Sequence, residues 1–335
     1  MNSKKIIGVN GFGRIGRYFT RLAILDPEVE LGLINDLSDV KTLMHLFKYD
    51  SIHGRFNLDF KIEGNLVRFS NGKTLAFSQE RDPSSIAWSD FNVSTVVECT
   101  GLFLTNELAS KHFNGGAQKV VLSAPAKDSS IKTVVLGVND DLLSENDRIV
   151  SNASCTTNNV APLIKVMQSI CDIEQCYIST IHSYTSDQRL HDSPHKDLRR
   201  ARAAGHSIIP TSTGAAKAIV KIFPKLEGLI SGGAIRVPVS DGSMTEITLI
   251  VDKKTSIEEI NQAMHNASKE QLAGILEVNS DPIVSIDVIG SPASSIYDET
   301  LSNVFNNMVR IVSWYDNESG YSNRLLELTK KVCPS

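Results

Sequence analysis

Short apolar runs alternate with amphipathic stretches through the first part of the chain. Residues 5–10 form an apolar run, and residues 14–25 carry apolar side chains at helical spacing. Residues 30–35 form a second run, and residues 39–49 predict a second helix with Asp39 as its N-cap. Further apolar runs follow at residues 94–99, 119–123, 133–136 and 148–151. Strands that are apolar along their whole length are typical of a parallel sheet, so the pattern predicts a doubly wound α/β domain with helices on both faces.

The pattern changes after about residue 152. Apolar and polar positions now alternate, which predicts half-buried strands of a mixed or antiparallel sheet. These segments are residues 175–184, 234–237, 245–252 and 308–315. Helical patterns lie among them at residues 157–171, 256–271 and 320–331. We therefore predict a first domain over residues 1–151, an α+β second domain over residues 152–317, and a last helix within residues 318–335 that returns to the first domain.

Composition excludes several classes of protein. The chain has 335 residues, a net charge of −4, 41% hydrophobic residues and 21% charged residues, which is ordinary globular composition. A disordered chain or a coiled-coil rod is therefore excluded, and the acidic balance argues against nucleic acid as the main partner. No apolar run approaches the roughly 18 residues of a membrane span. The five cysteines include no CxxC pair, which predicts reduced thiols and a cytoplasmic location.

A glycine-rich segment links the first predicted strand to the first predicted helix. Residues 10–16, NGFGRIG, contain the pattern GxGxxG. In this pattern Gly11 permits a tight turn, Gly13 lets the backbone approach a pyrophosphate, and Gly16 lets the helix pack against the strand. Asp36 lies 20 residues beyond Gly16, at the end of the second predicted strand, where a carboxylate accepts hydrogen bonds from a ribose. Because the segment follows a predicted strand, begins a predicted helix and is followed by Asp36, it predicts a Rossmann-type dinucleotide site rather than a chance glycine-rich turn.

A cysteine lies in a polar segment just beyond the last predicted strand of the first domain. Residues 151–159, SNASCTTNN, surround Cys155 with hydroxyl and amide groups, unlike the setting of a packed core cysteine. If a helix begins at Cys155, its dipole lowers the thiol pKa. Pro162 is compatible with that start and equally with a helix that begins later. His182 ends a predicted strand 27 residues further on. A thiol beside an imidazole is an activated nucleophile, although either residue alone is more often structural.

The densest run of basic residues covers residues 195–202, HKDLRRAR. Such runs are usually solvated surface, and the lack of interleaved aromatic residues argues against a nucleic-acid site. A third interpretation is a phosphate-binding loop. Residues 211–214, TSTG, and Arg236 supply further hydroxyl, N–H and guanidinium donors, and planar arginine donors suit phosphate oxygens.

Taken together, these motifs resemble those of the phosphorylating glyceraldehyde-3-phosphate dehydrogenase family over essentially the whole chain. The Ser-x-x-Ser-Cys-Thr-Thr-Asn stretch around Cys155 is highly specific. The other segments that carry the resemblance occur in the family's order, at residues 9–17, 48–54, 98–101, 123–127, 182–185, 194–203, 213–217, 236–238 and 313–318.

The resemblance implies a covalent oxidation of glyceraldehyde 3-phosphate, used in glycolysis and, in reverse, in gluconeogenesis. Cys155 would attack the aldehyde, with His182 as the base. Hydride would pass to NAD and leave a thioester on Cys155. Inorganic phosphate would then attack the thioester and release 1,3-bisphosphoglycerate. No metal is implied.

The resemblance also assigns binding roles position by position. The cofactor residues are Gly11, Gly13 and Gly16 in the turn, Arg14 and Ile15 at the pyrophosphate, Asp36 at the adenosine ribose, Arg81 and Ser123 along the site, and Asn317 at the nicotinamide carboxamide. The substrate phosphate would be bound by Thr185 and Arg236. The attacking phosphate would be bound by Ser154, Thr156, Arg200, Thr213 and Gly214, with Arg199 and Arg202 as close competitors of Arg200. The loop over residues 184–204 would reach a neighbouring subunit, which implies a homotetramer.

Two points of specificity stay open at the level of sequence. Asp36 would repel the additional phosphate of NADP and favours NAD, but Ser193-Pro194 stands where NAD-specific relatives carry Leu-Pro. An NADP-using biosynthetic form is therefore the alternative for the cofactor. Erythrose-4-phosphate dehydrogenase is the alternative for the substrate, although residues 183–188 match the triose-phosphate enzymes better. Asn159 stands where many members carry a second cysteine, which predicts that oxidation through a nearby disulfide partner is lost.

Overall fold

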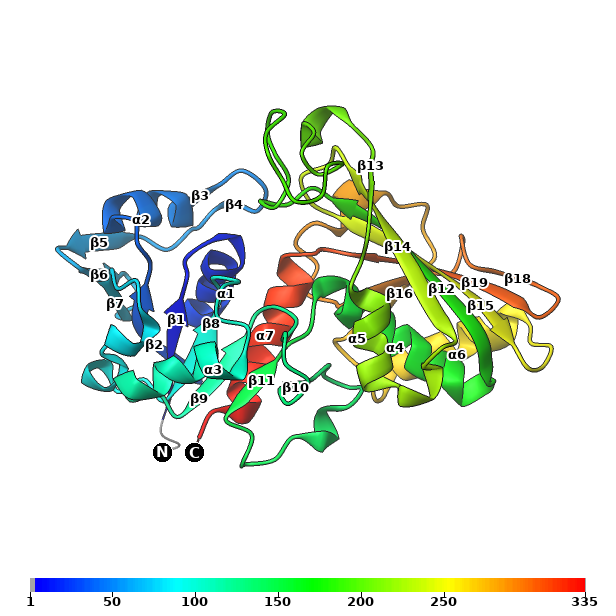
Figure 1. The fold of residues 1–335 in the computed structure, drawn as a ribbon, viewed down its shortest axis with the longest axis horizontal. Helices are drawn as coiled ribbons and strands as arrows, with labels where there is room; N and C mark the ends of the chain where they lie inside the picture. Colours follow the sequence, from blue (N-terminus) through cyan, green and yellow to red (C-terminus); the bar gives the residue numbers. More distant parts are fainter. Residues whose placement is uncertain (1–3, 335) are drawn as a thin grey trace. The chain divides into compact units, whose positions relative to one another are not determined.

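The computed structural model describes residues 4–334 and divides them into two compact units (Figure 1). The first unit contains residues 4–134, 141–153 and 322–334. The second unit contains residues 135–140 and 154–321. The first unit is therefore built from three chain segments, and the last of them is the C-terminal helix.

Within residues 4–334, the first unit is centred on a nine-stranded, mostly parallel sheet. β1 (Lys5–Asn10) lies between β2 (Val29–Asn35) and β8 (Thr95–Glu98) and pairs with both in parallel. The parallel part continues with β7 (Thr74–Ser78), β9 (Lys119–Leu122), β11 (Ile149–Ser151) and β10 (Lys132–Thr133). The strand order is β10-β11-β9-β8-β1-β2-β7-β6-β5. The predicted Rossmann-type α/β fold is confirmed, and the carboxyl ends of the parallel strands meet at one edge of the sheet.

Two details of this sheet differ from the prediction. An antiparallel edge, β5 (Phe60–Glu63) and β6 (Leu66–Phe69), was not expected, because charged residues interrupt its short apolar runs. The strand predicted over residues 133–136 ends at Thr133, and residues 135–140 belong to the second unit. A separate two-stranded ribbon is formed by β3 (Tyr49–Asp50) and β4 (Gly54–Arg55).

The helices of the first unit are α1 (Arg14–Leu25), α2 (Val40–Lys48), the single turn α3 (Asn106–Ala109) and most of α7 (Ser319–Val332). As predicted, Asp39 caps α2, and its carboxylate accepts a hydrogen bond from Thr42 N at 2.9 Å. None of the helices within residues 4–334 combines the length and the apolar character that crossing a membrane requires.

The last helix, α7, is joined to the first unit by charged side chains. Lys330 Nζ lies 2.9 Å from Asp26 Oδ2 and 2.7 Å from Glu28 Oε2. The carbonyl of Lys330 also accepts a hydrogen bond from Lys5 Nζ. These contacts hold the end of the chain against β1 and the loop between α1 and β2.

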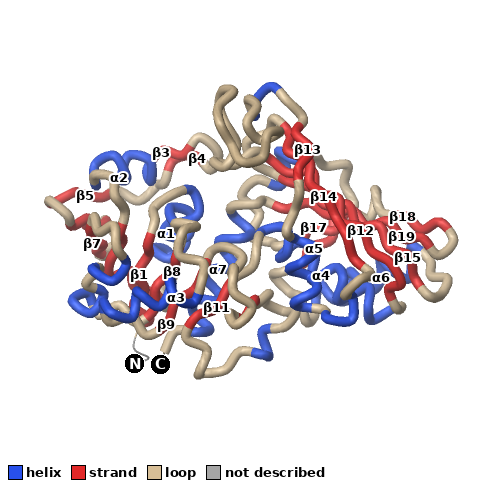
Figure 2. Tube along the Cα trace, viewed as in Figure 1, coloured by secondary structure: helices blue, strands red, loops and turns tan. Residues whose placement is uncertain are grey.

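Within the described residues, the second unit is built on an eight-stranded mixed sheet, in the order β13-β14-β12-β15-β19-β17-β16 with β18 paired to β19. The strands are β12 (Ile173–Ser183), β13 (Ile209–Thr211), β14 (Ile230–Val237), β15 (Ser243–Val251), β16 (Leu276–Asn279), β17 (Ser295–Asp298), β18 (Asn303–Phe305) and β19 (Met308–Tyr315). Figure 2 shows the helices along one side of this sheet: α4 (Cys155–Ile170), α5 (Ala215–Ile222) and α6 (Ile257–Lys269). The predicted mixed sheet is confirmed, since β12 pairs with β14 in parallel and with β15 antiparallel.

Candidate active site

The glycine-rich turn directly follows β1. Gly11 has a φ of +94°, a left-handed conformation that favours glycine, and its N–H donates to Asn35 O at 2.8 Å. A Cβ on Gly16 would lie 2.1 Å from the Gly11 carbonyl oxygen, so only glycine lets α1 pack this close to the turn. Gly13 is the N-cap of α1, and open space surrounds the position of a Cβ there. The turn therefore leaves room for a phosphate at the N-terminus of the helix.

Asp36 is held beside this turn. Its Oδ2 accepts a hydrogen bond from Phe12 N at 2.8 Å, and its Oδ1 accepts one from Ser38 N at 3.0 Å. The carboxylate is therefore fixed at the carboxyl end of β2, next to the end of β1. Ser123 follows β9 at the same edge of the sheet and is half-buried, whereas Arg81 is exposed.

The first turn of α1 carries a paired cation. Arg14 Nη1 lies 2.6 Å from Asp50 Oδ2, and Ile15 beside it is half-buried. Burial raises the pKa of Asp50, but hydrogen bonds from the backbone of His53 and Ile52, together with Arg14, outweigh burial and lower the pKa to about 2. Asp50 is therefore charged at neutral pH and holds the Arg14 side chain at the start of the helix.

A buried carboxylate connects β8 to β1. Glu98 is fully buried, and its Oε2 accepts a hydrogen bond from Asn10 Nδ2 at 2.6 Å. The Thr100 N–H donates to Oε1 at 2.7 Å, and the Thr100 hydroxyl donates to the same oxygen. Trp88 Nε1 donates to His112 Nδ1 at 3.2 Å, so His112 Nε2 carries the proton that reaches Glu98 Oε2 at 3.0 Å. These donors satisfy the carboxylate and hold the carboxyl ends of both strands in place.

In the second unit, α4 begins at Cys155. Ser154 is the N-cap, and its Oγ accepts a hydrogen bond from Thr157 N at 3.1 Å. Pro162 lies inside the helix, so the alternative of a later start is excluded. Cys155 is half-buried, and this burial raises the pKa of its thiol even though the charge of Arg236 lowers it. The prediction that the helix dipole lowers the thiol pKa is therefore wrong for the net change in that pKa, because desolvation of the thiol is the larger effect.

His182 lies beside the thiol. Its Nε2 is 3.4 Å from Cys155 Sγ, although the two residues are 27 positions apart. His182 is near the end of β12, and the parallel register of β12 and β14 places it directly opposite Arg236. Sheet pairing therefore brings the imidazole and the guanidinium together, and the start of α4 adds the thiol.

Two contacts bear on the protonation of His182. Its Nδ1 lies 2.8 Å from Ser183 O and 2.6 Å from Arg236 Nη1, which also donates to Ser183 O at 3.0 Å. If Nδ1 carries the proton, it donates a hydrogen bond to the Ser183 carbonyl, and the lone pair of Nε2 faces the thiol. If Nδ1 instead carries the lone pair, it accepts a hydrogen bond from Arg236. Only the first tautomer lets His182 take the thiol proton. Burial and the charge of Arg236 lower the pKa of His182 to about 3, so the ring is neutral at neutral pH.

Tyr315 is a residue of this site that the sequence pattern did not reveal. Its hydroxyl lies 3.0 Å from Thr156 Oγ1 in a hydrogen bond, and its ring meets His182 edge to face with centroids 5.9 Å apart. Burial raises the pKa of the Tyr315 hydroxyl, which is therefore neutral. Alternation along a strand predicts that Tyr315 is buried, but it carries no information about which side chains it contacts.

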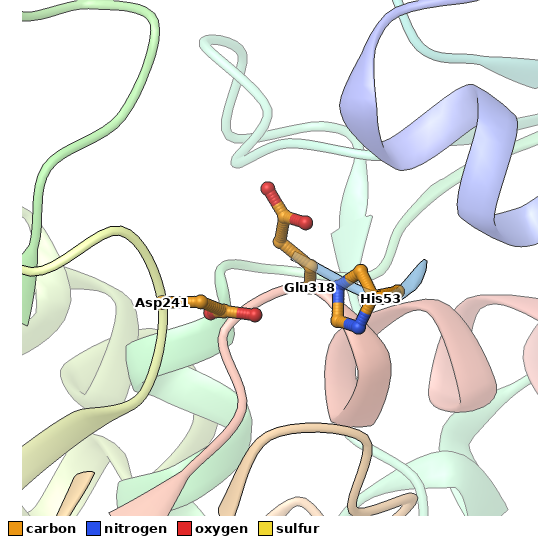
Figure 3. A group of neighbouring side chains, drawn as sticks. All are labelled: His53, Asp241 and Glu318. Atoms are coloured by element: carbon orange, nitrogen blue, oxygen red, sulfur yellow. The ribbon is translucent and has the colours of Figure 1, made fainter. Parts of the chain in front are cut away.

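Asp241 is a buried acid whose charge would act on the thiol. Burial, and then the charges of Asp316 and Glu318, raise the pKa of Asp241 to about 9. Its carboxyl group is therefore protonated at neutral pH and adds no negative charge near Cys155. Figure 3 draws the side chains of Asp241 and Glu318, both in the second unit.

Of the three candidate arginines, Arg200 is half-buried, and its Nε donates a hydrogen bond to Thr211 Oγ1 at 2.9 Å. Its charge acts on both His182 and Arg236, whereas the other two candidates, Arg199 and Arg202, are exposed. Burial therefore distinguishes Arg200 from the other two arginines, and its role as a phosphate ligand stays a prediction.

The other predicted anion ligands lie on two ordered loops. The Thr185 N–H and hydroxyl both donate to Gln188 Oε1, at 2.7 and 3.1 Å. Thr213 Oγ1 accepts a hydrogen bond from Ala215 N at 3.2 Å, and Gly214 is the N-cap of α5 with open space around its Cβ position. Local hydrogen bonds therefore fix both hydroxyl groups without any ligand.

Asn317 follows β19, and its amide oxygen accepts hydrogen bonds from the Ser183 and Ser243 hydroxyls at 2.8 and 2.7 Å. The two serines had no predicted role. They lie 60 positions apart in the chain, and no motif spacing links them to Asn317.

Comparison with known families assigns these features to a class of protein. Residues 5–106 match the family model described as glyceraldehyde 3-phosphate dehydrogenase, NAD binding domain. Together with the parallel sheet, the glycine-rich turn and the thiol–imidazole pair, this match defines the protein as an NAD-binding oxidoreductase.

The particular family follows from the rest of the chain. Residues 154–317 match the model described as glyceraldehyde 3-phosphate dehydrogenase, C-terminal domain. The chain is 49% identical over 324 residues to glyceraldehyde-3-phosphate dehydrogenase 1 of Bacillus cereus, with 96% of each chain covered. It is 47% identical over 328 residues to the enzyme of Geobacillus stearothermophilus, with 97% of each chain covered. It is 48% identical over 332 residues to that of Mycobacterium avium, with 97% of this chain and 98% of the relative covered. The chain belongs to the glyceraldehyde-3-phosphate dehydrogenase family.

Proposed function

We propose that this chain catalyses the reversible oxidation of glyceraldehyde 3-phosphate to 1,3-bisphosphoglycerate with NAD and inorganic phosphate, a cytoplasmic step of glycolysis and gluconeogenesis. The observation that carries the proposal is the 3.4 Å contact between Cys155 Sγ and His182 Nε2, beside Arg236. A thiol, a neutral imidazole and a cation together suit a thioester reaction on an anionic substrate.

In the proposed reaction, Cys155 Sγ bonds to the aldehyde carbon. The thiol proton moves to His182 Nε2 and on to the former carbonyl oxygen, which gives a hemithioacetal. NAD, when bound, accepts the hydride that the carbon then loses. His182 takes the hydroxyl proton back, and the carbonyl of a thioester forms. Phosphate attacks this carbonyl carbon and the C–S bond breaks. His182 returns its proton to the departing sulfur, the phosphate proton passes to solvent, and the acyl phosphate leaves Cys155.

The first unit supplies most of the cofactor site in this proposal. The open space beside Gly13 suits a pyrophosphate. Asp36 would accept hydrogen bonds from the adenosine ribose and would repel the 2′-phosphate of NADP, which makes NAD the cofactor. The remaining cofactor contacts would come from Gly11, Arg14, Ile15, Gly16, Arg81, Ser123 and, in the second unit, Asn317.

The anion ligands would also prepare the base. Arg236, with Thr185, would bind the substrate phosphate. An anion on Arg236 would draw its N–H away from His182 Nδ1, which favours the tautomer with the proton on Nδ1. That tautomer is the one that can take the thiol proton, so substrate binding would activate His182. The attacking phosphate would be bound by Ser154, Thr156, Arg200, Thr213 and Gly214.

We also propose that the chain works as a homotetramer. Leu190 and Leu198, in the loop over residues 184–204, are 81% and 82% exposed. Tyr177 of β12 is 51% exposed, on the opposite side of the strand from buried Ile178. Large apolar side chains that are exposed on a single chain are typical of surfaces that another subunit covers. Light scattering of the purified protein should therefore give four times the chain mass of 36.7 kDa, and a monomeric mass would contradict the proposal.

Formation of NADH tests the proposed reaction. Glyceraldehyde 3-phosphate, NAD and phosphate should give steady turnover, which stops without phosphate and resumes with arsenate. Cys155→Ser should abolish turnover. A higher kcat/KM with erythrose 4-phosphate than with glyceraldehyde 3-phosphate would identify erythrose 4-phosphate as the substrate. A higher kcat/KM with NADP than with NAD would identify NADP as the cofactor.

A further inference from the structure

Two buried hydroxyl groups meet on one amide oxygen in the second unit. Ser183 Oγ donates to Asn317 Oδ1 at 2.8 Å, and Ser243 Oγ donates to the same oxygen at 2.7 Å. The Ser183 N–H donates to Ser243 Oγ at 3.2 Å, which joins the two serines directly. Ser183 and Ser243 are 0% and 1% exposed, and Asn317 is 7% exposed. The amide oxygen is therefore enclosed, and its two acceptor positions are occupied.

This arrangement determines which way the amide faces. Among residues 4–334, the Ser183 and Ser243 hydroxyls donate only to Asn317 Oδ1. If the amide were rotated by half a turn, its NH2 group would face both hydroxyls and their protons would have no acceptor in a buried site. The hydroxyl pair therefore favours the orientation with Oδ1 inward. Asn317 Nδ2 then has no hydrogen-bond partner within the described residues, and its two N–H donors are available to a ligand.

We propose that Ser183 and Ser243 are positioning residues that give Asn317 one amide orientation, so that it offers N–H donors and no acceptor to the nicotinamide substituent. This inference rests on the proposed function, in which Asn317 holds the carboxamide of NAD. The fixed amide would select the carbonyl oxygen of that carboxamide, and the ring would be held in one rotational state. The serines act through Asn317 and touch neither the substrate nor the reacting atoms in this role.

The inference predicts a specific response to a cofactor analogue. The acetylpyridine analogue of NAD keeps the carbonyl group but lacks the amide N–H donors. A fixed Asn317 should bind both nucleotides through the carbonyl. In the double variant Ser183→Ala with Ser243→Ala, the Asn317 amide can rotate and present Oδ1. NAD can pair with either orientation, because it can also donate its own N–H to that oxygen, whereas the acetyl group pairs only with the orientation that presents Nδ2.

Titration calorimetry of the full chain measures this difference without any turnover. The double variant should weaken binding of the acetylpyridine analogue by about twofold more than binding of NAD, because only the analogue must select one of two amide orientations. Each single variant should show a smaller effect, because one hydroxyl remains. ADP-ribose, which has no nicotinamide ring, should bind the double variant and the wild type equally.

Ser302→Ala provides a matched control. Ser302 is buried, and its hydroxyl donates to Asp298 O at 2.7 Å and accepts from Val312 N at 3.0 Å, away from Asn317. This variant should leave the ratio of the two affinities unchanged. The inference would be overturned if the double variant lost the same affinity for NAD and for its analogue. It would also be overturned if neither affinity fell while ADP-ribose binding was unchanged. Failure of the wild type to form NADH would instead count against the proposed function alone.

Discussion

Replacing His182 with asparagine tests whether the imidazole is the base. Asparagine keeps a neutral polar side chain but cannot take a proton at Nε2, which lies 3.4 Å from Cys155 Sγ. Burial holds the pKa of the Cys155 thiol above its ordinary value of 9.0. At pH 7, at most about one thiol in a hundred is therefore ionised without help.

The size of the effect follows from that fraction. Because only about one thiol in a hundred is ionised, a base that removes the proton during attack should raise the rate by at least about a hundredfold. General bases in enzymes raise rates by up to about 10⁴-fold. His182→Asn should therefore lower the rate of the first NADH-forming turnover at pH 7 by about 10²- to 10⁴-fold, or about 3–5 kcal/mol. The pKa of His182 is lowered to about 3, so the ring stays unprotonated, with the same protonation state, throughout the neutral range. The wild-type rate should therefore change little between pH 6 and pH 8.

A stopped-flow measurement of the first turnover across this pH range is the assay. Without the base, attack depends on spontaneous ionisation, so the His182→Asn rate should rise about tenfold per pH unit below the thiol pKa. His45→Asn, an exposed histidine of α2, serves as the control and should behave as the wild type. A His182→Asn variant with the wild-type rate and the wild-type pH profile would refute the reasoning.

Four further predictions concern other parts of the molecule. Alkylation of Cys155 by iodoacetamide should abolish NADH formation and leave NAD binding by calorimetry nearly unchanged; full turnover after complete alkylation would defeat the covalent mechanism. Asp36→Ser should reduce the preference for NAD over NADP, measured as kcat/KM, by about tenfold or more, because the repulsive carboxylate is removed; an unchanged ratio would remove Asp36 from cofactor selection. Glu98→Gln should lower the free energy of unfolding by about 2 kcal/mol, because the new amide NH2 faces hydrogen-bond donors in a buried network. Thermal melting measures this change, and an unchanged melting midpoint would contradict the prediction. The Asp241 carboxyl has a folded-state pKa of about 9 against an ordinary 3.8, so its stabilising contribution is present below about pH 4 and is lost as the pH rises towards 9. The melting temperature of Asp241→Asn should therefore fall less between about pH 5 and pH 9 than that of the wild type, and parallel curves would contradict the assignment.

The order of strands and helices was predictable from the chain, because each element depends on its own residues. The apolar spacing of residues 5–10 and 14–25 predicted β1 and α1 with their observed bounds, and residues 308–315 did the same for β19. The glycine-rich turn was predictable for the same reason, since the conformation of Gly11 and the close packing at Gly16 are local requirements.

Prediction ended where two local effects competed. A helix start at or after Cys155 was equally compatible with Pro162, and the structure begins α4 at Cys155 with the proline inside. The antiparallel edge β5–β6 was missed because its strands are short and carry charged residues. Boundaries of this kind depend on packing against neighbouring elements, which outweighs weak local preference.

Local residue patterns were enough to predict the type of sheet in each part of the chain, the glycine-rich turn and a cysteine in a polar segment. The surroundings of that cysteine, and hence its chemistry, depend on the packing of distant segments. The register of β12 and β14 brings His182 opposite Arg236, and the start of α4 places Cys155 against the imidazole. Burial then raises the thiol pKa, against the direction that the helix dipole alone predicts. Desolvation depends on everything that surrounds the sulfur, and residues distant in the chain make up those surroundings, so no local spacing could specify it.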